Sequence, residues 1–344
     1  MRGGGPAGIW IALVALVAVA ACGGSTPERI ARPTPTPDLT PVTVKVGQVA
    51  STQWAPLYVA IARGYFQRLN VNVQLQALRL GQDPVDLISR GQIDVSMTDF
   101  NAAVFNGLGG GLPYRIVGSM AAIPTGGTPP VQLEVAKPLL DHGTVKTLAD
   151  LKGRKIAIDG GAGSGSGYLA GLALQSAGVG LKDMTVIDLA ATDMEEAFRI
   201  GSIDAALAPA PYSTTMEQHG VAVPKAAPPA GTTWSGVLYG AKLGGSAGLR
   251  FFQALVKGAR DLTGPDRASD DTLGIVSKST GIGPDVLKTV PPYDWDQALK
   301  PDTASLAGLQ ASYRTVGLLK YGADLPASRI VDTTYSKRAA SARP

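Results

Sequence analysis

One order of predicted elements, strand–helix–strand–helix–strand, occurs twice in this sequence and restricts the chain to folds built on parallel sheets. Short runs rich in β-branched residues predict the strands, and longer apolar stretches that end near glycine predict the helices between them. The first copy has strands at 44–47, 71–75 and 93–97 with helices at 56–63 and 83–90, and the second has strands at 155–158, 185–188 and 203–207 with helices at 168–176 and 194–200. This alternation is typical of α/β proteins in which helices flank a mainly parallel sheet.

A short segment matches between the two copies. Residues 90–94, Arg-Gly-Gln-Ile-Asp, correspond to residues 200–204, Ile-Gly-Ser-Ile-Asp, and in each a glycine suited to a left-handed helix end precedes an Ile-Asp pair. The sequence therefore predicts two lobes of one architecture. Ligands of open parallel sheets bind beyond the carboxyl ends of the strands, so two such lobes would share one cleft.

The predicted lobes are discontinuous in sequence. Residues 120–128 are expected to cross from the first lobe to the second, and residues 232–238 to return as a strand. Predicted helices at 249–262 and 304–319 would then pack back on the first lobe. We assign the ranges 42–120 and 235–336 to lobe 1, 121–234 to lobe 2 and 337–344 to a C-terminal tail.

The first 41 residues differ in kind from the rest. Arg2 and the short apolar run after it are typical of a signal peptide, and the run is too short to span a membrane comfortably. The tetrad Val-Ala-Ala-Cys that ends at Cys22 resembles a bacterial lipobox. We expect residues 1–21 to be removed, Cys22 to be lipidated and residues 22–41, rich in Pro and Thr, to form a tether. The mature protein would then be extracytoplasmic and anchored to the bacterial cell membrane.

Composition excludes several kinds of partner. The net charge of +4 is small for 344 residues, and no concentrated basic stripe indicates a nucleic-acid binder. Cys22 is the only cysteine, so the chain forms no internal disulfide. His142 and His219 are the only histidines and lie far apart in sequence, which disfavours a His/Cys metal site. We predict no cofactor, no metal and no nucleic-acid partner, and we expect a monomer.

Several motifs resemble those of type II periplasmic binding proteins, over about residues 44–335. The subgroup resembled is the NMT1/THI5-like group, whose members bind sulfonates, nitrate, taurine and thiamine precursors. The motifs lie at 56–60, 63–66, 91–94, 147–157, 198–205 and 211–212, and the Leu-Lys-Gly-Arg-Lys run at 151–155 is the most specific of them. The resemblance implies a binding protein that closes about a hinge around a small-molecule ligand. It also implies permease and ATPase partners of an ABC importer.

The glycine- and serine-rich loop at 160–167 is the most informative candidate for ligand binding. Backbone N–H groups at Gly163 and Gly165 could approach a ligand closely, Ser164 and Ser166 add hydroxyl donors, and a following helix start favours negative charge. In the proteins that the chain resembles, this loop contacts the anionic end of the ligand. We therefore predict an anion-bearing, sulfonate-like solute. A flexible connector is the alternative interpretation of the loop.

Two nucleotide-binding interpretations of this loop are disfavoured. It is not a Walker A motif, because no Gly-Lys-Ser/Thr follows. Residues 165–170 fit the dinucleotide pattern Gly-x-Gly-x-x-Ala, with Asp188 at about the expected distance, but this match begins several residues after the strand, where a tight first turn is required.

Other candidate residues follow the predicted strands of the first lobe or lie near the second lobe and the hinge. They are Ser51, Thr52, Gln53, Trp54, Thr98, Asp99, Asn101, Tyr212 and Trp234. Asp99 could pair with an amine of the ligand or cap the helix expected to start at Asn101, and capping is the favoured interpretation. Trp54 could line the cleft or act as a hydrophobic staple, and the other aromatic residues could belong to the core. A neutral aromatic heterocycle held by Trp54 and Tyr212 is the alternative ligand.

Enzyme chemistry has little support in the sequence. Asp94 and Asp204 could be read as a catalytic pair, but each begins a strand at the end of the sheet opposite the cleft, so helix caps or salt bridges are expected. No Gly-x-Ser-x-Gly elbow of a serine hydrolase is present. We predict a binding protein and not an enzyme. An enzyme on the same scaffold and a sensor that signals to a membrane receptor are the rival interpretations.

Overall fold

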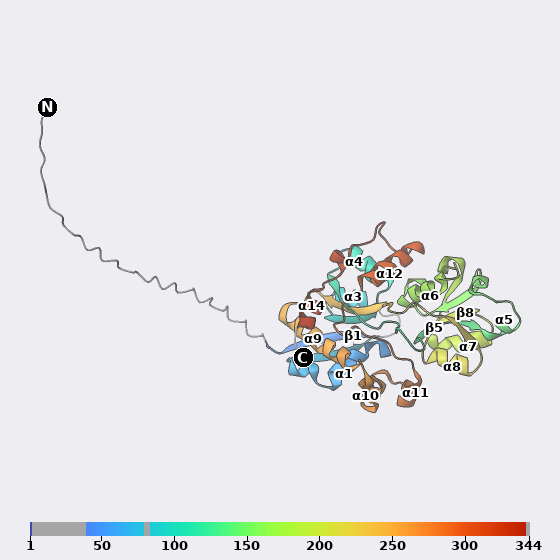
Figure 1. Ribbon diagram of the computed structural model, residues 1–344, viewed down its shortest axis with the longest axis horizontal. Coiled ribbons are helices and arrows are strands. Elements are labelled where there is room, and N and C mark those ends of the chain that lie inside the picture. Colours follow the sequence, from blue (N-terminus) through green and yellow to red (C-terminus); the bar gives the residue numbers. More distant parts are fainter. Residues whose placement is uncertain (2–38, 79–82, 342–344) are drawn as a thin grey trace. The chain divides into compact units, whose positions relative to one another are not determined.

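The computed structural model describes Met1, residues 39–78 and residues 83–341 (Figure 1). Asp38–Pro344 forms one compact unit that contains all of the described strands and helices. The predicted signal segment, Cys22 and most of the predicted tether lie outside the described residues. No helix in the described part of the chain is long and apolar enough to cross a membrane.

The first lobe is built on a five-stranded sheet. Its strands are β1 (Val42–Gln48), β2 (Val71–Ala77), β3 (Val95–Asp99), β4 (Tyr114–Ser119) and β10 (Ser235–Gly240). The strand order is β2-β1-β3-β10-β4, and β1 pairs in parallel with both β2 and β3. β10 lies antiparallel between β3 and β4. The sheet is therefore mixed, with one strand running against the other four.

The second lobe repeats this plan. Its strands are β5 (Val131–Ala136), β6 (Lys155–Ile158), β7 (Thr185–Asp188), β8 (Ala205–Pro209) and β9 (Ala222–Ala226). The order is β7-β6-β8-β5-β9, with β6 parallel to β7 and β8, and β5 antiparallel between β8 and β9. In each sheet the antiparallel strand is the first one formed after the chain crosses between the lobes. The predicted two-lobe α/β fold is confirmed.

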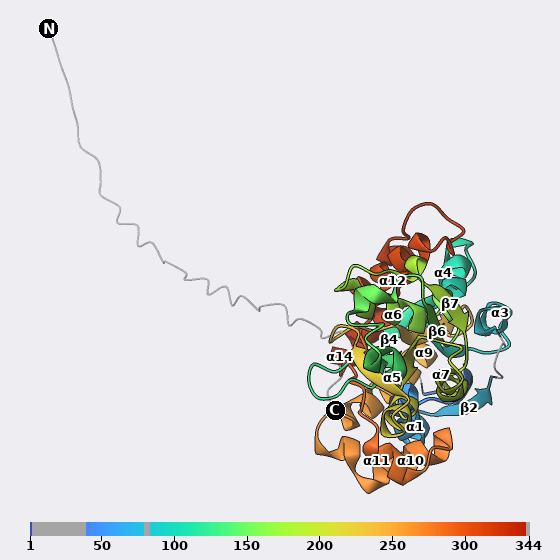
Figure 2. The same cartoon turned by 90° about the vertical axis from the view of Figure 1, so that its right-hand side faces the viewer.

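Helices cover both sheets. Those of the first lobe are α1 (Ala55–Ala62), α2 (Tyr65–Arg68), α3 (Pro84–Ser89), α4 (Ala102–Gly109), α9 (Gly245–Asp261), α10 (Asp270–Thr280), α11 (Pro284–Thr289), α12 (Thr303–Thr315), α13 (Ala327–Ile330) and α14 (Thr334–Ser341). Those of the second lobe are α5 (Lys137–Asp141), α6 (Gly165–Gln175), α7 (Met194–Arg199) and α8 (Tyr212–Gln218). In Figures 1 and 2, α4 and α12 lie on one side of the first sheet, and α1, α10 and α11 lie on the other.

Several predicted boundaries need correction. β6 and β7 have the predicted bounds, but β3 and β8 begin two residues later than expected, at Val95 and Ala205. The reason is that Asp94 and Asp204 turn their carboxylates toward the neighbouring strand, where each accepts a hydrogen bond of 2.9 Å from a backbone N–H. The returning strand β10 is shifted to Ser235–Gly240, and α12 ends at Thr315 and not near residue 319.

Two crossing segments connect the lobes and pair with each other. Ile123 donates its backbone N–H to the carbonyl of Thr232, at 3.0 Å, and Gly231 donates to the carbonyl of Ile123, at 2.8 Å. Away from these segments, Tyr168 of α6 lies against Gly308 of α12, where an added Cβ would come within 2.5 Å of the tyrosine hydroxyl. The lobes therefore meet at the crossing segments and at this helix pair.

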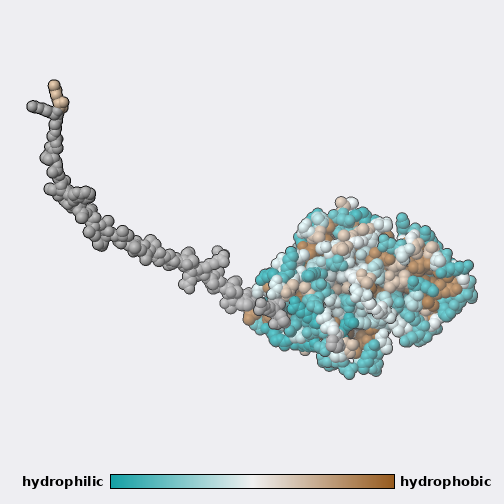
Figure 3. Space-filling view, in the orientation of Figure 1, coloured by the Kyte–Doolittle hydropathy of each residue, from teal (hydrophilic) through white to brown (hydrophobic). Residues whose placement is uncertain are grey.

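Apolar side chains fill both lobes. One large cluster of buried residues covers the first sheet and one face of the second, and a smaller cluster lies on the other face of the second sheet under α7 and α8. Figure 3 shows hydrophilic residues over much of one face of this unit, interrupted by hydrophobic patches.

Candidate functional site

A cavity of about 500 Å³, which we call the inner cavity, lies where strand ends of the two lobes meet. The segments that line it directly follow β1 and β3 of the first lobe and β6, β7 and β8 of the second. These are the carboxyl ends of parallel strands, the position at which open α/β sheets bind ligands. The predicted shared cleft is thus present as a cavity lined by both lobes.

Most of the predicted site residues come together here. Eleven of them line the inner cavity: Ser51, Thr52, Gln53, Trp54, Thr98, Asp99, Asn101, Ser164, Ser166, Tyr212 and Trp234. Gly163 lines a neighbouring groove instead. Gly165 is buried behind the cavity wall, where an added Cβ would lie 2.5 Å from Cδ1 of Trp234. Direct contact of these residues with a ligand stays a prediction.

In the first lobe, the wall after β1 is held by hydrogen bonds within the loop. The Ser51 hydroxyl accepts from the backbone N–H of Gln53, at 3.2 Å, and caps the short 3-10 helix Thr52–Trp54. Trp54 is buried and donates its indole N–H to the carbonyl of Val49, at 2.8 Å. Trp54 lines the cavity and is buried, and it is the N-cap residue of α1, so it does not occupy the position before the cap that a hydrophobic staple uses.

The N-terminus of α6 forms the corresponding wall of the second lobe. The helix begins at Gly165, three residues before the predicted start at Tyr168, because Ser164 acts as its N-cap. The Ser164 hydroxyl accepts from the N–H of Gly167, at 3.0 Å, and lies 2.8 Å from the carbonyl oxygens of Asp159 and Gly161. Its hydrogen-bonding capacity is used within the loop, whereas Ser166 lines the cavity.

The structure corrects the favoured role of Asp99. The N-cap of α4 is Asn101, whose side-chain oxygen accepts from the N–H of Val104 at 3.0 Å, so Asp99 does not cap this helix. The Asp99 carboxylate is instead free to face the cavity. One of its oxygens lies against the first residue of α6, 3.1 Å from where a Cβ on Gly165 would be.

A second carboxylate, Asp159, also lines the cavity, and the sequence interpretation missed it. Asp159 directly follows the predicted strand 155–158, a position that could have signalled a cleft residue in the same way as Asp99 after β3. Burial, and then the nearby Asp159 carboxylate, raise the pKa of Asp99 to about 7. Two carboxylates from opposite lobes therefore share one small space.

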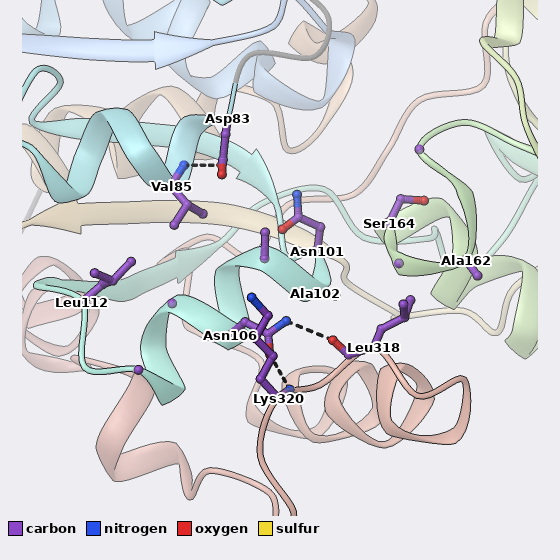
Figure 4. Close-up of a pocket in the computed structure, with 15 residues that line it drawn as sticks. Asp83, Val85, Asn101, Ala102, Asn106, Leu112, Ala162, Ser164, Leu318 and Lys320 are labelled. Atoms are coloured by element: carbon purple, nitrogen blue, oxygen red, sulfur yellow. Dashed lines mark hydrogen bonds between the residues drawn. The ribbon is translucent and has the colours of Figure 1, made fainter.

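A second hollow of about 890 Å³, the outer groove, lies beside the inner cavity and is shown in Figure 4. Ser164 on the second lobe faces Asn101 and Ala102 at the start of α4 across it. On the first-lobe side, the Asn106 side chain donates to the carbonyl of Leu318 at 2.9 Å and accepts from the N–H of Lys320 at 2.8 Å. The outer groove shares Asn101 and Ser164 with the inner cavity, so the two are adjoining parts of one interlobe space.

Of the helix caps or salt bridges expected for Asp94 and Asp204, the structure shows one salt bridge, at Asp204, and both residues instead accept a backbone N–H of the neighbouring strand. Each lies just before its strand, at the end of the sheet away from the inner cavity. Asp204 also pairs with Arg154 at 3.3 Å. In the described part of the chain, no group of three or more His, Cys, Asp or Glu residues is placed to hold a metal ion.

Solved structures share this architecture. The alkanesulfonate-binding protein SsuA of Xanthomonas axonopodis pv. citri, bound to MOPS, superposes with a TM-score of 0.64 and 19% identity over 86% of this chain and 99% of its own. The periplasmic nitrate-binding protein NrtA of Synechocystis PCC 6803 superposes with a TM-score of 0.67 and 13% identity, over 87% and 88% of the two chains. The desulfurization enzyme DSZB has the same fold, with a TM-score of 0.57, 13% identity and coverage of 87% and 98%.

The fold and the interlobe cavity define a protein of the two-lobe periplasmic binding class. The model of one family, described as NMT1/THI5 like, matches residues 51–224, which is just over half of the sequence. The chain therefore belongs to the NMT1/THI5-like family. A comparison with curated protein sequences finds no match. The resemblance stated from the motifs is confirmed, and the similar binding proteins are extracytoplasmic components of import systems.

Proposed function

We propose that this chain is the solute-binding component of an ABC importer, which captures a small organic solute in the inner cavity and delivers it to a permease and an ATPase. The observation that carries the proposal is the cavity itself, lined by the carboxyl ends of equivalent strands from both lobes. A volume of about 500 Å³ is within the range of small-molecule sites. The family and the fold shared with SsuA and NrtA support an import role.

Hinge closure is the second part of the proposal. The two hydrogen-bonded crossing segments would act as the hinge between bodies formed by residues 42–120 with 235–336 and by residues 121–234. Ligand binding favours closure only if the ligand makes better contacts in the closed state. The cavity meets this condition, because its polar side chains come from both lobes and contact a common ligand together only when the lobes approach.

Attachment to the membrane is the third part. We propose that Cys22 carries the lipid and that the Pro- and Thr-rich segment at 22–41 tethers a monomeric binding unit outside the cell. Replacement of Cys22 by Ala should abolish labelling with radioactive palmitate and move the protein from the membrane fraction to the soluble fraction. Retention of the Cys22→Ala variant in the membrane fraction would show that another element holds it there.

Native mass spectrometry of the chain purified from its own cell envelope tests solute capture even while the solute is unidentified. We expect one copurifying small molecule per chain. Thr192 and Ala50 are exposed residues that line the inner cavity on opposite lobes. Thr192→Trp or Ala50→Trp should occupy the cavity and remove the bound mass. Thr185→Trp is the matched control, because Thr185 is also exposed but begins β7, at the other end of the strand.

Three results would contradict the proposed function. The first is a bound mass that survives both cavity-filling substitutions, which would place the ligand elsewhere. The second is chemical conversion of the captured molecule during incubation, which would indicate an enzyme. The third is copurification of a membrane receptor without a permease and an ATPase, which would indicate a sensor.

A further inference from the structure

The charged side chains that line the inner cavity all have one sign. Asp99 follows β3 in the first lobe and Asp159 follows β6 in the second. Among the described residues that line the cavity there is no Arg, Lys or His. From the described residues, a bound anion would therefore meet two carboxylates and no side-chain cation, although recognition of a sulfonate or a nitrate depends on cationic or strongly donating groups.

The remaining polar groups of the cavity are largely used or are acceptors. Ser164 and Asn101 cap helices, and Ser51 caps the short 3-10 helix of its loop. Gln53 has a buried side-chain oxygen, Oε1, without a hydrogen-bond partner in the described structure. In the same part of the chain, neither the Asp99 nor the Asp159 carboxylate makes a hydrogen bond or an ion pair. These acceptors would be satisfied by a ligand that donates hydrogen bonds.

The N-terminus of α6, which would attract an anionic ligand, already has a carboxylate of the protein beside it. The backbone at the N-terminus of α6 favours negative charge, and the Asp99 carboxylate from the opposite lobe lies against Gly165, the first residue of that helix. The protein's own carboxylate thus lies where the head group of an anionic solute would bind. Burial, and then Asp159, raise the pKa of Asp99, and among the described residues no cationic side chain pairs with this carboxylate.

We propose that the inner cavity selects solutes that carry a basic nitrogen, and that Asp99 and Asp159 hold the protonated nitrogen between the two lobes. The body of the solute would pack on the apolar part of the wall, which includes Met97, Leu207 and the exposed ring of Tyr212. This inference rests on the proposed solute-binding function and names the ligand class. It departs from the sulfonate-like solute predicted from the sequence, because Ser164, one of the two predicted hydroxyl donors, caps α6, and the Asp99 carboxylate lies against the start of that helix.

The test measures binding of matched compounds that differ only in charge. Amines, alcohols and sulfonates on the same ethyl, benzyl and 2-phenylethyl skeletons are titrated into the purified full chain, with detection by calorimetry and thermal shift. We expect the amines to bind most tightly on each skeleton. Asp99→Asn should weaken amine binding by at least about tenfold, because it removes the charge of a partly buried partner.

Two further variants keep the result interpretable. Asp159→Asn changes an exposed side chain, so it should fold normally even if Asp99→Asn does not, and it should also weaken amine binding. Asp94→Asn is the matched control, because Asp94 lies just before β3, whereas Asp99 is the last residue of that strand. It should leave the affinity for amines unchanged.

The outcomes separate the ligand class from the function. Tightest binding of sulfonates, especially if it is lost in Lys320→Ala of the outer groove or in Arg79→Ala outside the described residues, would overturn the amine proposal but keep the solute-binding function. Equal binding of alcohols and amines would also overturn it. Failure of every amine to bind would overturn the amine proposal, and the solute-binding function would then be judged by the copurified mass and its loss in Thr192→Trp.

Discussion

The two lobes share one strand order but fill their interiors with different side chains. The first lobe has a network of aromatic rings in which Phe251 lies 4.9 Å from Phe66 and 6.0 Å from Tyr239, measured between ring centroids. The smaller cluster of the second lobe has eleven buried residues, of which seven are alanine. Its larger members are Phe198, Met194, Met216 and Ile203.

This difference shows that the topology does not depend on one kind of core. What the lobes have in common is the alternation of strands and helices and the insertion of an antiparallel strand after each crossing. Small side chains allow helices to lie close to a sheet, but each buries less apolar surface than an aromatic ring, and the stabilisation follows the area buried. We infer that the alanine-rich face under α7 and α8 contributes less to stability than the aromatic core of the first lobe, whereas the other face of the second sheet belongs to the large cluster that both lobes share.

The largest predicted effect comes from removing a ring from the first lobe. Phe251 is fully buried, so Phe251→Ala should lower the free energy of unfolding by about 3–5 kcal/mol through lost burial and a residual cavity. Urea unfolding followed by tryptophan fluorescence measures this effect. Trp54, Trp234 and Trp295 belong to or border the first lobe, and residues 131–226 contain no tryptophan, so the fluorescence reports mainly on the first lobe.

Phe198→Ala in the second lobe is the matched control. Phe198 is also buried, on the inner face of α7, so its loss should destabilise the second lobe and be seen by circular dichroism with a smaller change in the fluorescence midpoint. If the fluorescence midpoint and the circular dichroism midpoint shift equally in Phe251→Ala, and again in Phe198→Ala, the lobes unfold as one unit. The difference in core composition would then have no separate energetic meaning.

A buried carboxylate in the second lobe makes the stability of this lobe depend on pH. Glu134 of β5 is fully buried opposite Ala206 of β8, and neither of its oxygens has a hydrogen-bond partner in the described structure. Burial, and then the nearby Glu217 carboxylate, raise the pKa of Glu134 from 4.5 to about 8. The folded protein therefore holds a proton that the unfolded chain releases at lower pH.

The second prediction follows from this difference. Between about pH 5 and pH 8 the folded state binds more protons than the unfolded state at Glu134, so the stabilising effect of the proton is lost as the pH rises toward 8. Glu134→Gln removes this titration. Its stability relative to the wild type should rise by about 1.4 kcal/mol per pH unit in the middle of that range, and by roughly 3–4 kcal/mol between pH 5 and pH 8.

The measurement is urea unfolding of both proteins, followed by circular dichroism at several pH values. The difference between variant and wild type isolates Glu134 from other groups with a raised pKa, such as Asp99. A difference that is independent of pH would show that Glu134 is ionised or hydrated in the folded protein.

The alternation of elements was sufficient to predict the fold, because the parallel strands near the centres of both sheets carry buried apolar residues, such as Val95 and Met97 of β3 and Ala205 and Leu207 of β8. The sequence interpretation missed β4, β5 and β9, however. β5 and β9 carry polar residues such as Glu134, Gln132 and Lys225. The antiparallel insertion of β5 and β10 was also missed, because strand direction depends on where the chain crosses between lobes and not on local pattern.

The positions of site residues were more predictable than their chemistry. A residue at or soon after the end of a strand reaches the cleft by geometry alone, and this placed Asp99, the last residue of β3, and Ser51, in the loop after β1, correctly in the cavity wall. Ser166 reaches the same wall from the first turn of α6. The available hydrogen bonds could not be read from the sequence, because they depend on which side chains cap helices. Ser164 looked like a ligand donor but caps α6, and Asp99 looked like a cap but faces the cavity.

The smallest predicted effect is the loss of stability when either of two equivalent aspartates, one in each lobe, is replaced. Asp94 and Asp204 each accept a backbone N–H at 2.9 Å, from Lys45 and Lys155, so alanine at either position should cost about 1 kcal/mol of stability. Asparagine keeps an acceptor oxygen and should cost less. Both Asp204→Ala and Asp204→Asn also break the partly exposed pair with Arg154, which adds up to about 1 kcal/mol that the Asp94 variants do not lose.

This comparison tests whether the aspartate before the strand contributes equally to stability in both lobes. If the alanine variants have similar costs in both lobes, the aspartate before β3 and β8 holds the parallel strand pair together regardless of the core beneath it. A much larger loss for Asp204→Ala than for Asp94→Ala, with no difference between the asparagine variants, would mean that the second lobe tolerates local damage less well. The weaker alanine-rich core would then set the stability of the whole repeat, because the same missing hydrogen bond would matter more where less apolar surface is buried.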